Sequence, residues 1–287
     1  MEKLEDNTAV WLLKVLTAMA APTLLQNLTI GSLVLRDYDT YMAQAGDTVN
    51  VPIMPILSSH TNALPIGNAQ VVLNRHMEAS FSIPDMTECL ANPKRLEIYL
   101  APALLALAQS IDGDLARLWS GFTSNLPISA AALTEGVIDD AETALYLAKI
   151  PLAEPKFILA DTSMYRQARQ SPRFDDETGN FKGLRVVRSL AVVKDLAPPV
   201  THGIAFAGAA MGLISRRPPP RPSDYPGKEF VEGHSELADI GLRVRLYPDP
   251  AVLHQSGSVE CLYGVGVLRE KFGLQINVSA AEQQKAA

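Results

Sequence analysis

The stretch that decides the fold is Asn92–Phe122, NPKRLEIYLAPALLALAQSIDGDLARLWSGF. Apolar residues recur in it every three or four positions, which places them on one side of a helix. This stripe comprises Leu100, Leu104, Leu107, Ile111, Leu115, Leu118 and Phe122. Most of the charged and amide residues lie off the stripe, namely Lys94, Arg95, Glu97, Gln109, Asp112, Asp114 and Arg117. The pattern predicts a helix of roughly 45 Å.

Prolines and an asparagine shape this predicted helix. Asn92 is a good N-cap, and Pro93 suits the first helical position. Pro102 removes one backbone hydrogen bond from the interior, so we expect either a kink there or two abutting helices.

The N-terminal region predicts a short helix over residues 7–19, followed by an extended arm over 20–35 broken at Pro22 and Gly31. The helix is apolar around most of its circumference and must be buried. Because little chain surrounds it, we expect another subunit to bury it through Trp11, Leu12, Val15 and Leu16. Acidic residues near the start exclude a signal peptide. No run is expected to reach the length of a membrane span.

Residues 44–84 predict a long β-hairpin. Polar and apolar residues alternate over 48–51 and again from Asn74, while residues 55–68 read as the tip. An isolated hairpin is marginal in water, so its apolar side needs a cover. We expect a neighbouring subunit to provide it, with the hairpin's own domain as the alternative. The expected contact residues are Val49, Val51, Met77, Ala79, Phe81 and Ile83. On this interpretation Phe81→Asp blocks assembly and leaves a soluble monomer.

The remainder of the chain predicts a mixed lobe and returning strands. Helices are expected over 134–148, 161–169 and 208–214, and strands over 156–160, 186–193, 203–207, 242–247, 259–267 and 274–278. Gly264 and Gly266 share one face of the longest strand, where another backbone can approach closely. The fold class is therefore α+β.

Composition and motifs exclude several function classes. A net charge of −6 argues against general nucleic-acid binding, which needs a basic surface. Cys89 and Cys261 match no metal spacing and are expected to be buried. The histidines, His60, His76, His202, His234 and His254, form no metal motif either. No nucleophile elbow, phosphate loop or dinucleotide fingerprint occurs. We expect no enzyme activity, catalytic residue, cofactor or metal site.

Several stretches together resemble the major coat proteins of tailed bacteriophages, in the branch of the short-tailed phages. They are 46–52 with the alternating arm 71–83, then 99–112, 203–206 and 262–267, in the order of that family. The resemblance implies the Hong Kong ninety-seven-type capsid fold. Its parts would be an N-terminal arm (1–33), an extended E-loop (34–86), a spine helix (87–122), an axial domain (123–235) and a peripheral sheet with the C-terminal tail (236–287).

The same resemblance implies a major capsid protein. Pentamers and hexamers would tile an icosahedral head around packaged double-stranded DNA, without sequence-specific DNA binding and without a membrane. The implied location is the virion, with assembly in the host cytoplasm. Because the chain begins with Met1, we expect no maturation cleavage and a separate scaffolding protein, with portal and cement proteins as further partners.

Relatives that weld their subunits covalently use an E-loop lysine. This chain has no lysine between Lys14 and Lys94, so the resemblance implies a non-covalent shell. Two alternatives stay open. One is an encapsulin-like protein compartment with the same fold, and the other is a soluble α/β enzyme.

Overall fold

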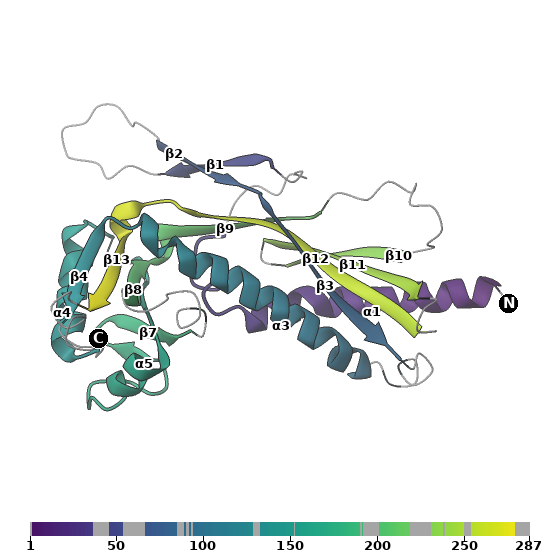
Figure 1. Cartoon of the computed structure of the whole chain (residues 1–287), viewed down its shortest axis with the longest axis horizontal. Helices are drawn as coiled ribbons and strands as arrows, with labels where there is room; N and C mark the ends of the chain where they lie inside the picture. Colours follow the sequence, from purple (N-terminus) through teal and green to yellow (C-terminus); the bar gives the residue numbers. More distant parts are fainter. Residues whose placement is uncertain are drawn as a thin grey trace, which may run out of the picture.

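The computed structural model shows an elongated molecule with one β-sheet toward each end (Figure 1). The structure describes residues 2–36, 46–53, 67–84, 89, 92, 94–128, 133–151, 153–189, 191, 201–218, 231–237, 239–249 and 254–278. One continuous hydrophobic core runs through both sheets, and a smaller cluster lies beneath a projecting hairpin.

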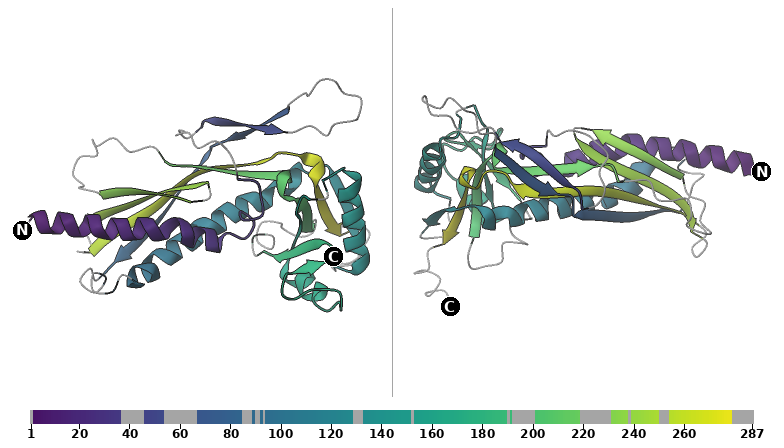
Figure 2. Two further views of the ribbon diagram at one scale, coloured as in Figure 1. Left: turned by 180° about the vertical axis from the view of Figure 1, so that it is seen from behind. Right: turned by 90° about the horizontal axis from the view of Figure 1, so that it is seen from above.

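The first sheet is antiparallel, with strand order β10-β11-β12-β3. A further strand, β9, also pairs with β12. Their bounds are Arg75–Ile83 (β3), Met211–Arg216 (β9), Val231–Leu237 (β10), Ile240–Asp249 (β11) and His254–Val267 (β12). Two long helices, α1 (Glu2–Asn27) and α3 (Lys94–Ala116), lie against this sheet (Figure 2).

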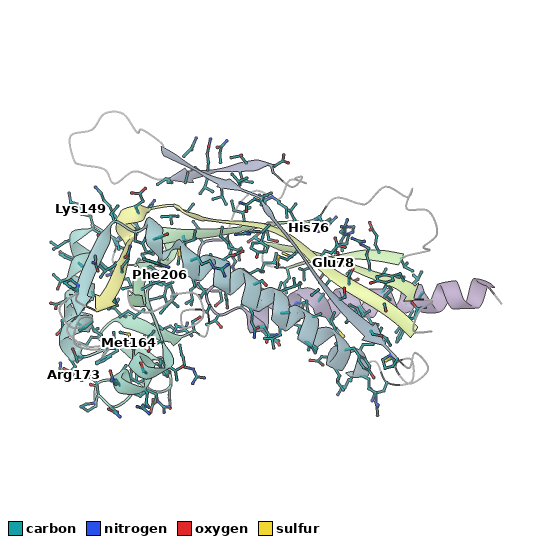
Figure 3. The ribbon with its side chains drawn as sticks, in the orientation of Figure 1. His76, Glu78, Lys149, Met164, Arg173 and Phe206 are labelled. Atoms are coloured by element: carbon teal, nitrogen blue, oxygen red, sulfur yellow. The ribbon has the colours of Figure 1, made fainter. Side chains whose placement is uncertain are left out.

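The second sheet has the order β4-β13-β8-β5-β7-β6, with β4–β13 and β5–β7 parallel and the other pairs antiparallel. Its strands are Ser124–Ile128 (β4), Lys156–Ala160 (β5), Asn180–Phe181 (β6), Leu184–Arg188 (β7), Thr201–Ala207 (β8) and Gly273–Val278 (β13). The helices α4 (Glu135–Leu147) and α5 (Thr162–Ala168) pack on it. Phe206 and Met164 lie inside this domain, whereas Lys149 and Arg173 lie at its surface (Figure 3).

Three crossings of the chain join the two sheets, and each passes through a 3-10 turn. These turns are η1 (Arg117–Gly121), η2 (Gly208–Ala210) and η3 (Glu270–Phe272). Because β9 and β10 belong to the first sheet and β13 to the second, the sheet boundaries differ from the expected division at residue 235. Residues 208–214, expected to be a helix, form η2 and most of β9 instead. Small residues there allow tight strand packing, as at Gly212 against Leu268.

The predicted spine helix is confirmed as α3, which continues into η1. Pro102 lies within one continuous helix. The backbone N–H of Lys94 donates to Asn92 Oδ1 at 3.3 Å, as an N-cap requires. The stripe residues from Leu100 to Leu115 are buried as predicted. Tyr263 on β12 donates its hydroxyl to Asp114 at 2.9 Å and ties the helix to the sheet.

Asp112 departs from the expectation that it lies off the buried side, because its side chain is buried. Its carboxylate accepts hydrogen bonds from the backbone N–H groups of Thr29, Ile30 and Gly31 at 2.8, 2.9 and 2.9 Å. Burial raises the pKa of Asp112, and these donors act in the opposite direction. The carboxylate therefore fixes the corner where the chain leaves α1.

The N-terminal helix is longer than predicted. It runs to Asn27 with Pro22 inside it, which corrects the expected extended arm over 20–35. Leu12, Leu16 and Leu24 are fully buried by their own chain. The stretch Ala9–Asn27 is long and apolar enough, by length and composition, to cross a membrane, which corrects the expectation that no run reaches that length. In the structure, this helix packs against α3, β10 and β11.

The expected long hairpin divides into two separate units. β1 (Thr48–Ile53) pairs with β2 (Gly67–Val72), from Thr48 opposite Val72 to Ile53 opposite Gly67. The segment that was expected to complete it forms β3, which pairs with β12 of the same chain. Its apolar side packs on α3, so the own-domain alternative is correct for β3. The expected tip, 55–68, lies largely outside the described residues.

We predict that Asp112→Ala lowers the free energy of unfolding of the unassembled chain by about 3 kcal/mol, because three buried donors lose their acceptor. Urea unfolding followed by circular dichroism measures the change. Ser110→Ala, on the same helix, is the matched control. Equal destabilisation by the two substitutions would show that Asp112 does not hold this corner.

The structure changes the expected effect of Phe81→Asp. Phe81 is 8% exposed, and its ring packs on Gly257 of β12. A carboxylate there loses the packing and carries a charge into the core, which should cost about 4 kcal/mol. We predict an unstable, poorly soluble monomer, while the exposed neighbour variant Ser82→Asp stays folded. If the Phe81→Asp variant unfolded at the same temperature as the wild type, the packing of Phe81 against β12 would be contradicted.

Candidate inter-subunit surfaces

The described residues contain no group of three or more His, Cys, Asp or Glu side chains that could hold a metal ion. Cys89 and Cys261 are buried as expected, and burial raises the pKa of the Cys261 thiol to about 11. His60 lies outside the described residues.

The first sheet contains a buried ionic cluster that the sequence patterns did not predict. Glu260 is fully buried on β12 and forms ion pairs with Arg243 and Arg245 of β11. His76 Nε2 on β3 lies 2.9 Å from Glu260 Oε2. The cluster thus connects three adjacent strands, and a buried charge of this kind depends on its partners. The sequence feature that indicates this cluster is the alternation of Arg243 and Arg245 with apolar residues along β11.

The structure separates the predicted contact residues into three groups. Leu12, Leu16, Val51, Phe81 and Ile83 are buried within their own chain. In this conformation their side chains present no surface to a neighbour. Met77 and Ala79 are half-buried and pack on the chain's own core. Trp11 is 40% exposed, whereas Val15 and Val49 are half-buried and pack against hydrophobic clusters of the same chain.

The β1–β2 hairpin is anchored on one side and open on the other. Val51, Val71 and Leu73 pack against residues of β9, β12 and the turn that follows β12. The carbonyl of Val72 sits against Gly264, which confirms the close backbone approach predicted for that glycine. The outer side chains are neutral and exposed, namely Thr48, Asn50, Pro52, Asn68, Gln70 and Val72. Residues 48–74 contain no Asp, Glu, Lys or Arg.

From residue 7 onward, helix α1 is also nearly free of charge. Between residues 7 and 35 the only charged side chain is Lys14. Trp11 is exposed on its outer side, and Val15 and Met19 are half-buried. Surfaces of free monomers normally carry charges of both signs, whereas the centres of protein interfaces are depleted of them. Helix α1 and the hairpin therefore both have the composition of an interface.

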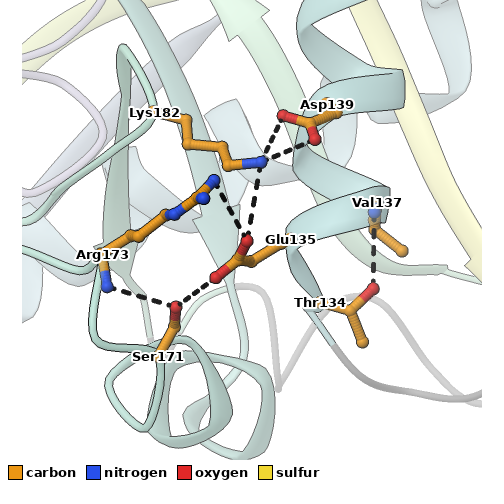
Figure 4. A network of polar contacts seen from close by, with 7 residues as sticks. All are labelled: Thr134, Glu135, Val137, Asp139, Ser171, Arg173 and Lys182. Carbon is orange, nitrogen blue, oxygen red and sulfur yellow. Dashed lines mark hydrogen bonds and ion pairs between the residues drawn. The ribbon is translucent and has the colours of Figure 1, made fainter.

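The second domain presents a different surface. Glu135 and Asp139 of α4 pair with Lys182, and Glu135 also pairs with Arg173, which ties α4 to neighbouring loops (Figure 4). Most of these groups are substantially exposed, so each pair contributes little to stability. At the other end of α4, Tyr146 and Leu147 are 63% and 73% exposed. They form a further exposed apolar surface.

Comparisons with known proteins agree with this architecture. No protein-family model and no curated protein matches the chain. Solved structures do match, including one from Mycobacterium phage Che8, with 15% identity over 87% of this chain and 90% of that one and a TM-score of 0.55. The capsid structure of the cyanophage P-SCSP1u matches at 14% identity, with 86% and 87% covered and a TM-score of 0.52.

A virus-like particle from Pyrococcus furiosus also matches, at 11% identity, with 92% of this chain and 97% of that chain covered and a TM-score of 0.57. At such identities the likeness concerns the fold alone. The chain has the α+β Hong Kong ninety-seven-type capsid fold that the sequence predicted.

Proposed function

We propose that this chain is the major capsid protein of a tailed bacteriophage, which self-assembles into an icosahedral head around packaged double-stranded DNA. The observation that carries the proposal is the match of 86% of this chain to a chain of the capsid structure of a cyanophage. The role is mechanical, and no group of catalytic residues is assigned.

The uncharged surfaces support self-association. A standard protein interface buries about 1,600 Å², and several such contacts per subunit reinforce one another. Trp11 is exposed and Val15 and Val49 are half-buried on α1 and the hairpin, and they are the proposed contact residues there. Pentamers and hexamers of the chain would form the shell, in the virion, after assembly in the host cytoplasm.

The remaining partners follow from the resemblance. A separate scaffolding protein, a portal and cement proteins are proposed, and the DNA is enclosed without sequence-specific contacts. The acidic chain, with a net charge of −6, suits a container that does not bind its DNA tightly. Because no lysine lies between Lys14 and Lys94, the shell is held without covalent links from the hairpin.

A protein compartment is the second candidate, because the fold also matches a virus-like particle from Pyrococcus furiosus. The contents of the purified shells distinguish a phage capsid from a protein compartment. Electron microscopy of particles from cells that naturally make the chain should show closed shells containing nuclease-resistant DNA. Shells that enclose protein and no DNA would favour the compartment. A 31.0 kDa monomer under all conditions would contradict both shell functions.

A further inference from the structure

Strand β10 lies at the edge of the first sheet, beside α1 (Figure 2). Among the described strands it pairs with β11 alone, so its second edge carries backbone donors and acceptors that no described strand uses. A groove of about 650 Å³ lies between β10 and the helix, and residues 231–235 all line it. A further strand can extend the sheet at an open edge of this kind.

Two side chains of β10 have polar atoms that lack a hydrogen bond. Glu232 Oε2 and His234 Nε2 are buried, and neither has a hydrogen-bond partner in the part of the chain that the structure describes. In the pairing with β11 they lie opposite Arg245 and Arg243, but both arginines are bound to Glu260. A buried polar atom without a partner costs free energy. A group from outside the subunit would remove this cost.

The two side chains have complementary chemistry. Burial is the main cause that lowers the pKa of His234, and the charges of Arg217 and Arg243 lower it further, whereas Glu232 raises it. The imidazole is therefore uncharged at neutral pH, and its Nε2 can donate a hydrogen bond to a carboxylate. Glu232 offers such a carboxylate. Within one chain the two atoms do not bond to each other, so each can bind its counterpart in a second chain.

Gly233, which lies between them, fixes the strand against the helix. A Cβ atom at Gly233 would lie 2.6 Å from Thr17 Oγ1, so only glycine fits at this distance. Two residues on, the backbone N–H of Ala21 donates to Ser235 Oγ at 3.3 Å. These contacts hold β10 in place before any partner arrives. A preformed edge loses little conformational freedom when it binds.

We propose that β10 pairs with β10 of a second copy of this chain, antiparallel about a two-fold axis that passes Gly233. In this register Glu232 lies opposite the second copy's His234, and Val231 lies opposite the second copy's Ser235. Each pair occurs twice, because both copies use the same surface. The groove residues 231–235 are thus the residues that pair, and the first sheets of two subunits become one. The inference rests on the proposed function, since it assigns one contact of the shell.

The charges along β10 favour this register over its neighbours. With the axis at His234, Glu232 would lie opposite Glu236, and like charges directly opposite each other are destabilising. With the axis at Glu232, that residue would lie opposite its own counterpart. With the axis at Ser235, Glu232 would lie opposite an alanine. Of these registers, the one centred on Gly233 alone gives partners to both unpaired atoms.

Disulfide trapping in assembled particles tests the pairing. One batch of chain carries Glu232→Cys, a second batch carries His234→Cys, and the two are assembled together and oxidised. At a mixed contact the two new thiols face each other, while the other half of the contact keeps its Glu–His pair. We expect a linked dimer on a non-reducing gel. Cys89 and Cys261 are buried, and the unsubstituted chain gives the background.

Two controls fix the register. In particles made from either variant alone, the new thiols are diagonal neighbours roughly 7–8 Å apart, which is beyond the reach of a disulfide. The second control combines Glu232→Cys with Leu237→Cys, an exposed position on the same strand. That position is out of register with residue 232. We expect background levels of dimer from both controls.

The outcomes separate this contact from the proposed function. If the wild-type chain forms no particles, the capsid proposal fails; linked dimers from the mixed soluble chains would still support the pairing, and their absence would overturn it. If particles form and the mixture links no better than the controls, the pairing is overturned and the shell remains.

Electron cryomicroscopy of wild-type particles gives a readout that needs no substitution. We expect the strand next to β10 at a two-fold axis to be β10 of the adjoining subunit. A strand from any other segment in that place, or no strand at all, would overturn the proposal.

Discussion

The structure depends on the packing of two long helices against one face of the first sheet. Helix α3 supplies an apolar stripe, and Asp112 on the same helix holds the corner at which the chain leaves α1. With α1 in place, Leu12, Leu16 and Leu24 join the same core as Phe81 and Ile83. One chain therefore seals this face without help from a neighbour. Burial of such side chains stabilises the subunit by about 2 kcal/mol each.

This closure determines which surfaces remain for association. The subunit leaves the outer side of the β1–β2 hairpin, the exposed side of α1 and the end of α4 uncovered. The hairpin and the part of α1 from residue 7 onward are nearly free of charge, and the end of α4 exposes Tyr146 and Leu147. A subunit with separate, complementary surfaces of this kind can build an extended assembly from contacts that are weak one at a time.

Sequence patterns predicted the positions of helices and strands better than they predicted what these elements pack against. The stripe from Leu100 to Leu115 and the alternation in β3 gave the correct periodicity, and Gly264 marked a real backbone contact. Periodicity says which side is buried, not which molecule covers it, so β3 and α1 were assigned to a neighbour. Pro22 suggested a break that tertiary packing overrides. Asp112 and the Glu260 cluster were missed because their partners are distant in sequence.

Hydrogen–deuterium exchange, compared between unassembled chain and particles, tests the closure of the subunit most directly. We predict that the β3 amides facing β12 exchange slowly in both states, because their hydrogen bonds to β12 already protect them. The outer amides of the β1–β2 hairpin should gain protection only in particles. Rapid exchange throughout β3 in the unassembled chain, with protection appearing only on assembly, would show that a single chain does not close this face of the sheet by itself.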